Sequence, residues 1–397
     1  MADVVAVSAG GRRVKRPTTT LEAPVPDPAP VPGPLHGLRV VELAGVGPAP
    51  FCAMLLADMG AEVLTIAAPG ERETRMPVPE DQDPIWRGRS RLALDLKQTD
   101  DHQRLLAILR QADVLIEGFR PGVLERLGVS PEVCLAVNPA LVIGRVTGWG
   151  QDGPLAQAPG HDPNYIALTG ALHAIGPAGG APVLPLNLVG DFGGGALYLA
   201  MGVLAAVLNA RQTGRGQVVE AAMVDGAASL MGMVYTLYNN GLWSDARGSN
   251  LMDGGAPFGA VYETADGKHV AVGALEPDCY AALLGILGLD LEDLPRQRDR
   301  DGWPVLRERF AAAFQTRSRD EWADLPEALA ACVTPVLSLA EAPGHPHNLA
   351  RGAFVGDPQI PGPAPRFSAT PSRLASMSDT PAADLLARWG VDQAPSP

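Results

Sequence analysis

Cysteine, lysine and aromatic residues are all scarce in this 397-residue sequence, which has four cysteines, three lysines and 5% aromatic residues. The cysteines are far apart and form no Cys-x-x-Cys pair: Cys52, Cys134, Cys279 and Cys332. Zinc knuckles and disulfide frameworks need closely or regularly spaced cysteines, so neither is indicated. The cysteine usage therefore favours a reducing, cytoplasmic compartment.

Positive charge is in short supply as well. The chain has 31 lysines and arginines against 44 aspartates and glutamates, which gives a net charge of −13 and a pI near 5.0. Nucleic acids and anionic membranes bind to concentrated basic surfaces, so neither is expected as a partner. A mean hydropathy of +0.07 argues against a membrane span. Any anionic ligand must be bound by a small local group of basic residues.

Apolar residues are plentiful, at 46% of the chain, which is enough for a large core and two domains. Residues 1–35 differ, because they combine basic residues with a proline-rich stretch and no apolar pattern. We expect a disordered arm there, without a secretory signal. The boundaries predicted after it are a large domain over 36–222, a linker helix region over 223–254, a small domain over 255–335, a return to the large domain over 336–380 and a loose tail over 381–397.

The first half of the chain has the alternation of strands and helices that is typical of a parallel sheet. The runs 38–43 and 61–66 have strand patterns, and Phe51 to Met59 between them has helical spacing, which makes a βαβ unit. Further strands are predicted at 92–96, 113–117 and 141–146, with a helix over 100–112. The predicted fold class is therefore α/β, with a nucleotide-fold-like parallel sheet in the large domain.

The second half predicts helices and then a smaller domain of mixed structure. The apolar, alanine-rich run 191–210 predicts a buried helix, and 218–245 predicts a strand start and a long helix whose methionines pack in the core. The runs 259–264 and 269–273, joined by a turn that contains glycine, predict a β-hairpin. The small domain is therefore expected to be α+β.

Three familiar motifs are absent or incomplete. Gly45-Val46-Gly47 follows the first strand but lacks the third glycine of a dinucleotide fingerprint, and Pro48 removes an N–H donor for pyrophosphate. His345-Pro346-His347 has no evident third metal ligand and is interpreted as a surface loop. No Gly-x-Ser-x-Gly elbow is present, so serine hydrolase chemistry lacks its nucleophile motif.

Three ionisable residues stand out from this background. His161 lies in a glycine-cornered turn before an apolar segment, where free amides at a helix N-terminus can hold a developing oxyanion. Asp191 precedes three glycines, which allow a ligand to approach closely, although a helix-capping role explains the same pattern. Glu276 lies between an apolar run and a proline, where an ordinary solvated carboxylate is the alternative.

The segments around these residues carry a family resemblance. Four of them resemble signature segments of α-methylacyl-CoA racemases, in the expected order: Gly-His-Asp-Pro-Asn-Tyr at 160–165, Gly-Asp-Phe-Gly-Gly-Gly at 190–195, Asp-Gly-Gly-Ala-Pro-Phe at 253–258 and Val-Gly-Ala-Leu-Glu-Pro at 272–277. Weaker similarity extends from about Leu38 to Val355. The resemblance implies the class III CoA-transferase (CaiB/BaiF) fold and an interlocked homodimer, whose site forms between one subunit's large domain and its partner's small domain.

The resemblance also implies a role for each ionisable residue. His161 and Asp191 would exchange protons with opposite faces of the α-carbon, and the backbone of Asp162 would hold the oxyanion of the enolate. The partner subunit's Glu276 would hydrogen-bond His161 and fix its tautomer. No metal or redox cofactor is implied, since CoA enters as part of the substrate.

Two departures from the family pattern concern substrate binding. Ile66-Ala67-Ala68-Pro69 stands where these racemases carry Val-Asp-Arg-Pro, so an arginine for the CoA phosphates is missing. The remaining candidates for CoA are Arg87, Arg89, Lys97 and Arg126. A thioester on an acyl carrier protein is the alternative. Gly259 and Cys279 replace a tyrosine and a phenylalanine, which enlarges the acyl pocket, and Tyr165 and Leu275 are further candidates for binding the substrate.

These features favour an α-methylacyl thioester racemase or epimerase, cytoplasmic and homodimeric. A class III CoA transferase, in which Asp191 attacks the thioester, is one alternative, and His161 argues against it because transferases of this fold generally lack that histidine. A biosynthetic tailoring enzyme that uses the same proton shuttle for isomerisation or cyclisation is another. The last is a catalytically silent acyl-CoA-binding protein, which the retention of all three ionisable residues disfavours.

Overall fold

The computed structural model describes residues 32–70, 83–376 and 380–391. Most of the predicted arm over 1–35, and the end of the predicted tail over 381–397, lie outside the described residues. Two parts of the chain are named here by their residues. The α/β region comprises the described residues of 32–222, and the small-sheet region comprises 255–335.

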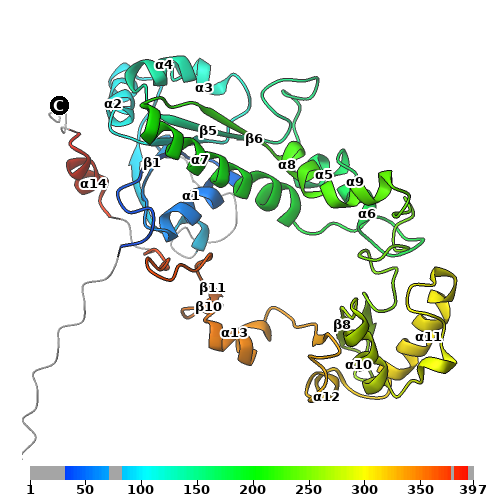
Figure 1. Cartoon of the computed structure of the whole chain (residues 1–397). Helices are drawn as coiled ribbons and strands as arrows, with labels where there is room; N and C mark the ends of the chain where they lie inside the picture. The colour runs from blue at the N-terminus through cyan, green and yellow to red at the C-terminus, as the bar shows by residue number, and fades with distance from the viewer. Residues whose placement is uncertain (1–31, 71–82, 377–379, 392–397) are drawn as a thin grey trace, which may run out of the picture. The chain divides into compact units, whose positions relative to one another are not determined.

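The first six strands form one parallel sheet (Figure 1). They are β1 (Arg39–Leu43), β2 (Glu62–Ala67), β3 (Arg89–Ala93), β4 (Val114–Glu117), β5 (Val142–Thr147) and β6 (Val218–Ala222). Their order in the sheet is β3-β2-β1-β4-β5-β6, and every pairing is parallel. The prediction of an α/β fold with a parallel sheet is therefore confirmed.

Strand β3 begins three residues before the predicted start at residue 92, because its first residues are polar and yet buried. The Nε–H of Arg89 donates to Glu42 Oε2 at 2.7 Å, and Thr65 donates to the same oxygen at 2.8 Å. Burying a charge is tolerated where an opposite charge and hydrogen bonds compensate it. A search for apolar residues misses such a strand.

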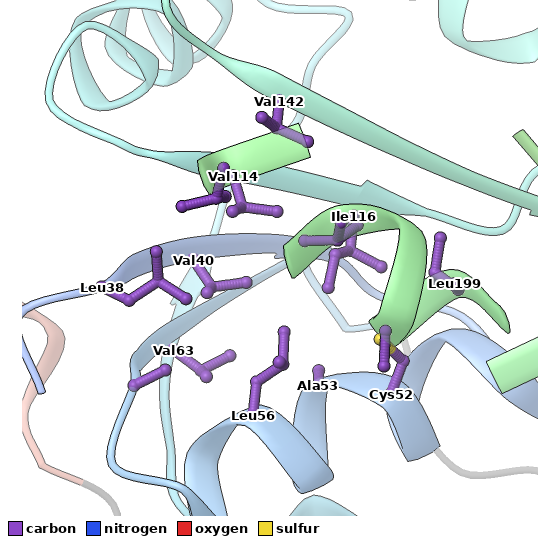
Figure 2. Close-up of a cluster of buried hydrophobic side chains, with 14 of the residues drawn as sticks. Leu38, Val40, Cys52, Ala53, Leu56, Val63, Val114, Ile116, Val142 and Leu199 are labelled. Atoms are coloured by element: carbon purple, nitrogen blue, oxygen red, sulfur yellow. The ribbon is translucent and has the colours of Figure 1, made fainter. Parts of the chain in front are cut away.

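The side chains of the sheet alternate between two faces, and each face has its own helices. Val40 points to the face covered by α1 and α7, and Figure 2 shows part of this core. Its neighbour Val41 points to the opposite face, which packs on α2 and α14. The helices that follow or cover the sheet are α1 (Pro48–Asp58), η2 (Pro84–Trp86), α2 (Thr99–Leu109), α3 (Val123–Arg126), α4 (Pro131–Val137), α5 (Asp162–Ala167), α6 (Ala171–Ala174), α7 (Tyr198–Thr213) and α14 (Ala382–Trp389).

A wide helical turn of π type, η3 (Leu188–Leu197), runs directly into α7. The sequence predicts a buried helix here, but only one side is buried: Leu199 and Val203 pack on the sheet, whereas Met201 and Leu208 are more than half exposed. Within the described residues, the continuous helix 188–213 is the one long and apolar enough to span a membrane by length and composition. The mean hydropathy of the whole chain therefore did not reveal this one apolar helix. Its buried side packs in the core of the α/β region.

The long helix predicted within 218–245 is two helices, α8 (Met223–Leu230) and α9 (Gly232–Asn239). Met231 separates them, because its ψ of 0° departs from helical geometry. The methionines do not form one buried stripe. Met223 is buried, whereas Met233 is exposed, so the prediction that these methionines pack in the core is wrong for Met233.

The small-sheet region has an antiparallel sheet of order β7-β8-β9. β7 (Val261–Glu263) and β8 (His269–Val272) form the predicted hairpin, with Gly267 at a φ of 73° in the turn. The third strand, β9 (Val333–Pro335), was not predicted, since three residues are too few for a pattern. The helices of this region are α10 (Pro277–Leu287), η4 (Leu291–Asp293), η5 (Arg300–Gly302), α11 (Trp303–Phe314) and α12 (Arg319–Ala323). After the region come η6 (Ala342–Gly344), α13 (Pro346–Arg351), β10 (Phe354–Val355) and β11 (Ile360–Pro361), and the last two pair as a separate antiparallel sheet.

Candidate active site

A cavity of about 230 Å³ lies at the carboxyl ends of the parallel strands. Loops after β1, β4 and β5 line it, together with the start of α5 and the turn η3. The residues that line the cavity include Gly47, Phe119, Arg120, Gly148, Trp149, His161, Tyr165 and Asp191. Ligands of open α/β sheets bind in such crevices, because the loops that leave the carboxyl ends diverge there.

His161 stands directly before α5, in an extended backbone conformation with φ −138° and ψ 175°. Its N–H donates to Asn164 Oδ1 at 3.0 Å, which closes the first turn of the helix. The imidazole is exposed and belongs to the lining of the cavity. The fold therefore presents His161 to a ligand instead of burying it in the core.

Asp162, the first residue of α5, connects this helix to the turn that carries Asp191. Its side chain is buried, and Oδ2 accepts the N–H groups of Gly190 at 2.7 Å and of Asp191 at 2.8 Å. The family resemblance predicts a role for the backbone of Asp162 alone, as a donor to the oxyanion. The contacts add a role for its carboxylate, which ties together two segments that are 29 residues apart.

The carboxylate of Asp191 is half-buried in the cavity wall. Burial is the largest effect on it and raises its pKa, the charge of Asp162 adds to the rise, and a hydrogen bond from Asn187 at 3.3 Å opposes it. Opposite the carboxylate lies Gly47, where a Cβ atom would come within 3.7 Å of Asp191 Oδ2. Asp191 is thus suited to carry a proton at a higher pH than an exposed aspartate.

The glycines after Asp191 serve helix packing. A Cβ atom on Gly194 would lie 2.7 Å from Ala227 N, and one on Gly226 would lie 2.0 Å from Gly194 O, so η3 and α8 touch through their backbones. Phe192 stacks on Phe51 of α1 at a centroid distance of 4.3 Å. The suggestion that these glycines make room for a ligand is corrected at Gly194, which is buried against α8.

Tyr165 lines the cavity, but its hydroxyl is already used, since it donates to the carbonyl of Gly160. Its ring meets Trp149 edge to face, with centroids 4.8 Å apart. A Cβ atom on Gly148 would lie 2.1 Å from the Tyr165 ring, so this position accepts only glycine in the present packing. Tyr165 therefore stabilises the turn that contains His161. The sequence did not indicate this role.

Arg120 lines the cavity and was not among the predicted site residues. It lies in Gly118-Phe119-Arg120-Pro121, the loop that leaves β4, and its side chain is exposed. Below it, Glu117 Oε2 accepts the N–H of Phe119 at 2.7 Å, while Arg145 donates to Glu117 Oε1 at 2.6 Å. Burial raises the pKa of Glu117, although Arg145 opposes the rise. A basic residue just past a strand end, next to Pro121, is the signal that could have identified Arg120.

The four predicted CoA-binding residues fall into two groups. Arg87 and Arg89 are buried in ion pairs, with Asp58 at 2.6 Å and with Glu42 at 2.7 Å. The prediction that these two arginines are free for CoA is wrong, because their donors stabilise the fold. Lys97 and Arg126 are exposed, and neither is among the described residues that line the cavity.

The predicted site residues of the small-sheet region form a separate group. Glu276 is exposed directly before α10, while Leu275 and Cys279 beside it are half-buried. A Cβ atom on Gly259 would lie 3.6 Å from Leu275 Cδ2, so these two predicted pocket residues are neighbours. None of them is among the described residues lining the cavity of His161 and Asp191. Their roles stay predictions. Within the described residues, no group of three or more His, Cys, Asp or Glu side chains is placed to hold a metal.

Comparison with known proteins shows the family of this chain. The model of CoA-transferase family III matches residues 35–386, which is most of the chain. The chain belongs to CoA-transferase family III. It is 44% identical to the α-methylacyl-CoA racemase of Mus musculus over 348 residues, 87% of this chain and 89% of that protein. It is 43% identical to the α-methylacyl-CoA racemase of Homo sapiens, over 85% of this chain and 87% of that protein.

Solved structures show the same fold. The crystal structure of a CAIB/BAIF family protein from Brucella suis matches with a TM-score of 0.77 at 23% identity, over 90% of this chain and all of that one. This member of CoA-transferase family III is therefore an α-methylacyl-CoA racemase-like protein with the CaiB/BaiF fold, homologous to isomerases that act on acyl-CoA.

Proposed function

We propose that this protein inverts the α-carbon of a 2-methylacyl thioester by a two-base proton transfer. The observation that supports this most directly is the cavity wall itself. His161 and Asp191 face one cavity of about 230 Å³, and Asp162 holds the turn of Asp191 while it begins the helix that follows His161. Two proton carriers on one cavity are what an inversion needs, because the proton must leave one face of the carbon and return to the other.

In the proposed mechanism, neutral His161 takes the α-proton from one face and the C–H electron pair moves toward the thioester carbonyl. The backbone N–H of Asp162 lies in the first turn of α5, where N–H groups have no intrahelical acceptor, and it donates to the enolate oxygen. Protonated Asp191 then delivers a proton to the opposite face. The roles reverse for the other enantiomer. The raised pKa of Asp191 keeps its protonated form accessible at a higher pH.

We also propose that the working unit is a homodimer in which the partner subunit's Glu276 completes the site. Exposed large apolar side chains support this: Leu197, Met201 and Leu208 on η3 and α7, and Met233 and Tyr238 on α9. Large exposed apolar patches mark interaction sites. Glu276 is exposed and available to reach another subunit. The four free cysteines support the proposed cytoplasmic location.

The thioester carrier is proposed to be CoA, with Arg120 as a binding residue. Arg120 is an exposed arginine on the cavity wall, whereas Arg87 and Arg89 are held in ion pairs. A guanidinium suits phosphate through charge-assisted hydrogen bonds. The loss of the family arginine near residue 68 keeps a carrier-protein thioester as an alternative outcome of the kinetic test described in the Discussion.

Incubation of one enantiomer of a 2-methylacyl-CoA in deuterated water tests the proposal. We expect inversion together with deuterium at the α-carbon. His161→Ala and Asp191→Ala should each lower the inversion rate by at least about 10²- to 10⁴-fold, the usual contribution of a general acid or base. His102→Ala, a histidine on α2 that bonds Gly128 O, is the matched control. Full activity in either site variant, or CoA transfer to a free carboxylate without α-deuterium, would contradict the two-base mechanism.

A further inference from the structure

One buried carboxylate oxygen joins the two segments that carry the proposed bases. Asp162 Oδ2 accepts hydrogen bonds from Gly190 N–H at 2.7 Å and Asp191 N–H at 2.8 Å, and the residue is only 3% exposed. His161 directly precedes Asp162 in the chain. The backbone of each base is therefore fixed through Asp162, by a peptide bond on one side and by a hydrogen bond on the other.

Resting on the proposed two-base reaction, we infer that Asp162 is a positioning residue whose carboxylate sets the separation of His161 and Asp191. Positioning matters here because a displacement of about 1 Å between reacting groups can cost about 10²-fold in rate. The role belongs to the side chain of Asp162. It is distinct from the donation to the enolate that we propose for the backbone N–H of the same residue.

The space beside this contact is small, and only a glycine at position 190 fits it. A Cβ atom on Gly190 would lie 2.6 Å from Asp162 Oδ2, so a larger residue would displace the carboxylate. Asp162 Oδ1 is buried and has no hydrogen-bond partner among the described residues. The two hydrogen bonds that the Asp162 carboxylate accepts therefore both come from the turn of Asp191. A burial of this kind is costly unless both amides hold the charge.

Two substitutions separate the anchor from the charge. In Asp162→Asn the carbonyl oxygen can occupy the place of Oδ2 and keep both amide donors, while the NH₂ group takes the place of Oδ1 and removes no existing bond. In Asp162→Ala both the acceptor and the charge are lost. The backbone N–H of residue 162 stays in both variants.

We expect Asp162→Ala to lower kcat for inversion by about 10²-fold with a KM change below about 3-fold, because the bases move apart and the substrate contacts remain. Exchange of the α-proton by His161 alone needs only one base. For the enantiomer whose proton faces His161, the ratio of deuterium exchange to inversion should therefore rise. A residue with a merely structural role would lower both rates together.

Asp162→Asn should keep most of kcat and change the pH profile. The groups that face Asp191 are His161, Asp162 and Asn187, with Tyr165 nearby. Burial is the main cause of the raised pKa of Asp191, and the Asp162 charge adds to it. Removing that charge lowers the pKa. In the direction in which Asp191 is the base, activity appears as pH rises through this pKa, so the acidic limb of kcat/KM should move to lower pH.

Amide hydrogen exchange of the 188–197 segment tests the anchor independently of the reaction. Asp162→Ala should expose these amides and speed their exchange by about 10-fold or more, whereas Asp162→Asn should leave it near that of the wild type. Asp58→Asn, which disrupts a buried aspartate paired with Arg87 away from the cavity, controls for a general loss of stability. Unchanged amide exchange and kcat in folded Asp162→Ala would overturn the inference. A wild-type protein that exchanges no α-proton would overturn the proposed function instead.

Discussion

The two carboxylates that we propose for the reaction, Asp191 and Glu276, lie in different surroundings. Asp191, in the α/β region, is fixed by Asp162 at its amide and by Asn187 at its carboxylate, and its neighbour Phe192 stacks on α1. Glu276, in the small-sheet region, is exposed, and its carboxylate accepts no hydrogen bond within the described residues. The α/β region therefore orients Asp191 within one chain, whereas no described residue orients the carboxylate of Glu276 by a hydrogen bond.

The largest effect is expected where the site is most tightly built. Gly148→Ala would place a Cβ atom 2.1 Å from the Tyr165 ring, and this ring supports the turn of His161. We expect a loss of about 1–3 kcal/mol of stability from overpacking, and a fall in kcat of about 10²-fold from displacement of His161. Thermal unfolding and inversion kinetics measure the two effects.

The control for this substitution is Gly285→Ala on α10. No atom lies within 4 Å of the added Cβ atom there, so the variant should keep its activity and gain about 0.5–1 kcal/mol of helix stability. If Gly148→Ala behaved like Gly285→Ala, the α/β half of the site would be less rigid than the packing indicates.

A smaller effect is expected at the cavity rim. Arg120→Ala removes an exposed charge from the wall, and one charge-assisted hydrogen bond lost is worth about 1.5–3 kcal/mol, which corresponds to about 10-fold or more in KM. The increase should appear with the CoA thioester and be absent with the pantetheine thioester of the same acyl group. Arg110→Ala, which removes an exposed arginine at the end of α2 outside the cavity lining, is the matched control. Equal changes in KM for the two thioesters would contradict the proposed role of Arg120 in CoA binding and would favour a carrier-protein thioester.

The smallest expected effect concerns mixed dimers, which test whether Glu276 acts on the partner subunit's His161. Dimers that combine a His161→Ala chain with a Glu276→Gln chain should have one site that lacks both groups and one intact site. We expect about half of the wild-type rate from such mixed dimers, isolated with two affinity tags, although each parent dimer is strongly impaired. Mixed dimers as inactive as the parents would mean that Glu276 serves its own chain or no site.

The alternation of strands and helices could be predicted because apolar residues repeat locally with the period of a strand or of a helix. The runs near 40, 63, 115 and 144 all became strands of the parallel sheet, with ends within one or two residues of the prediction. β3 was shifted because Arg89 is buried by its pairing with Glu42, which lies 47 residues away in the chain. The break between α8 and α9 and the exposed side of α7 were also missed, since both depend on which surfaces find a partner.

The candidate site could be predicted only in part. His161 and Asp191 were found because each stands in a turn bounded by glycine, and the cavity brings the two together. Arg87 and Arg89 were misjudged, because an arginine that pairs with a carboxylate looks the same in sequence as one that binds phosphate. Arg120 could not be predicted because nothing in the local sequence shows that its side chain lies on the cavity wall.

The sequence by itself determined the order of the elements, the parallel sheet and the titratable residues that we propose for the reaction. Only the tertiary structure decided which charges face a ligand and which stabilise the fold. The physical reason is distance along the chain. Helix and strand periods repeat within a few residues, whereas the contact between Asp162 and Asp191 spans 29 residues and depends on how α5 packs beside η3.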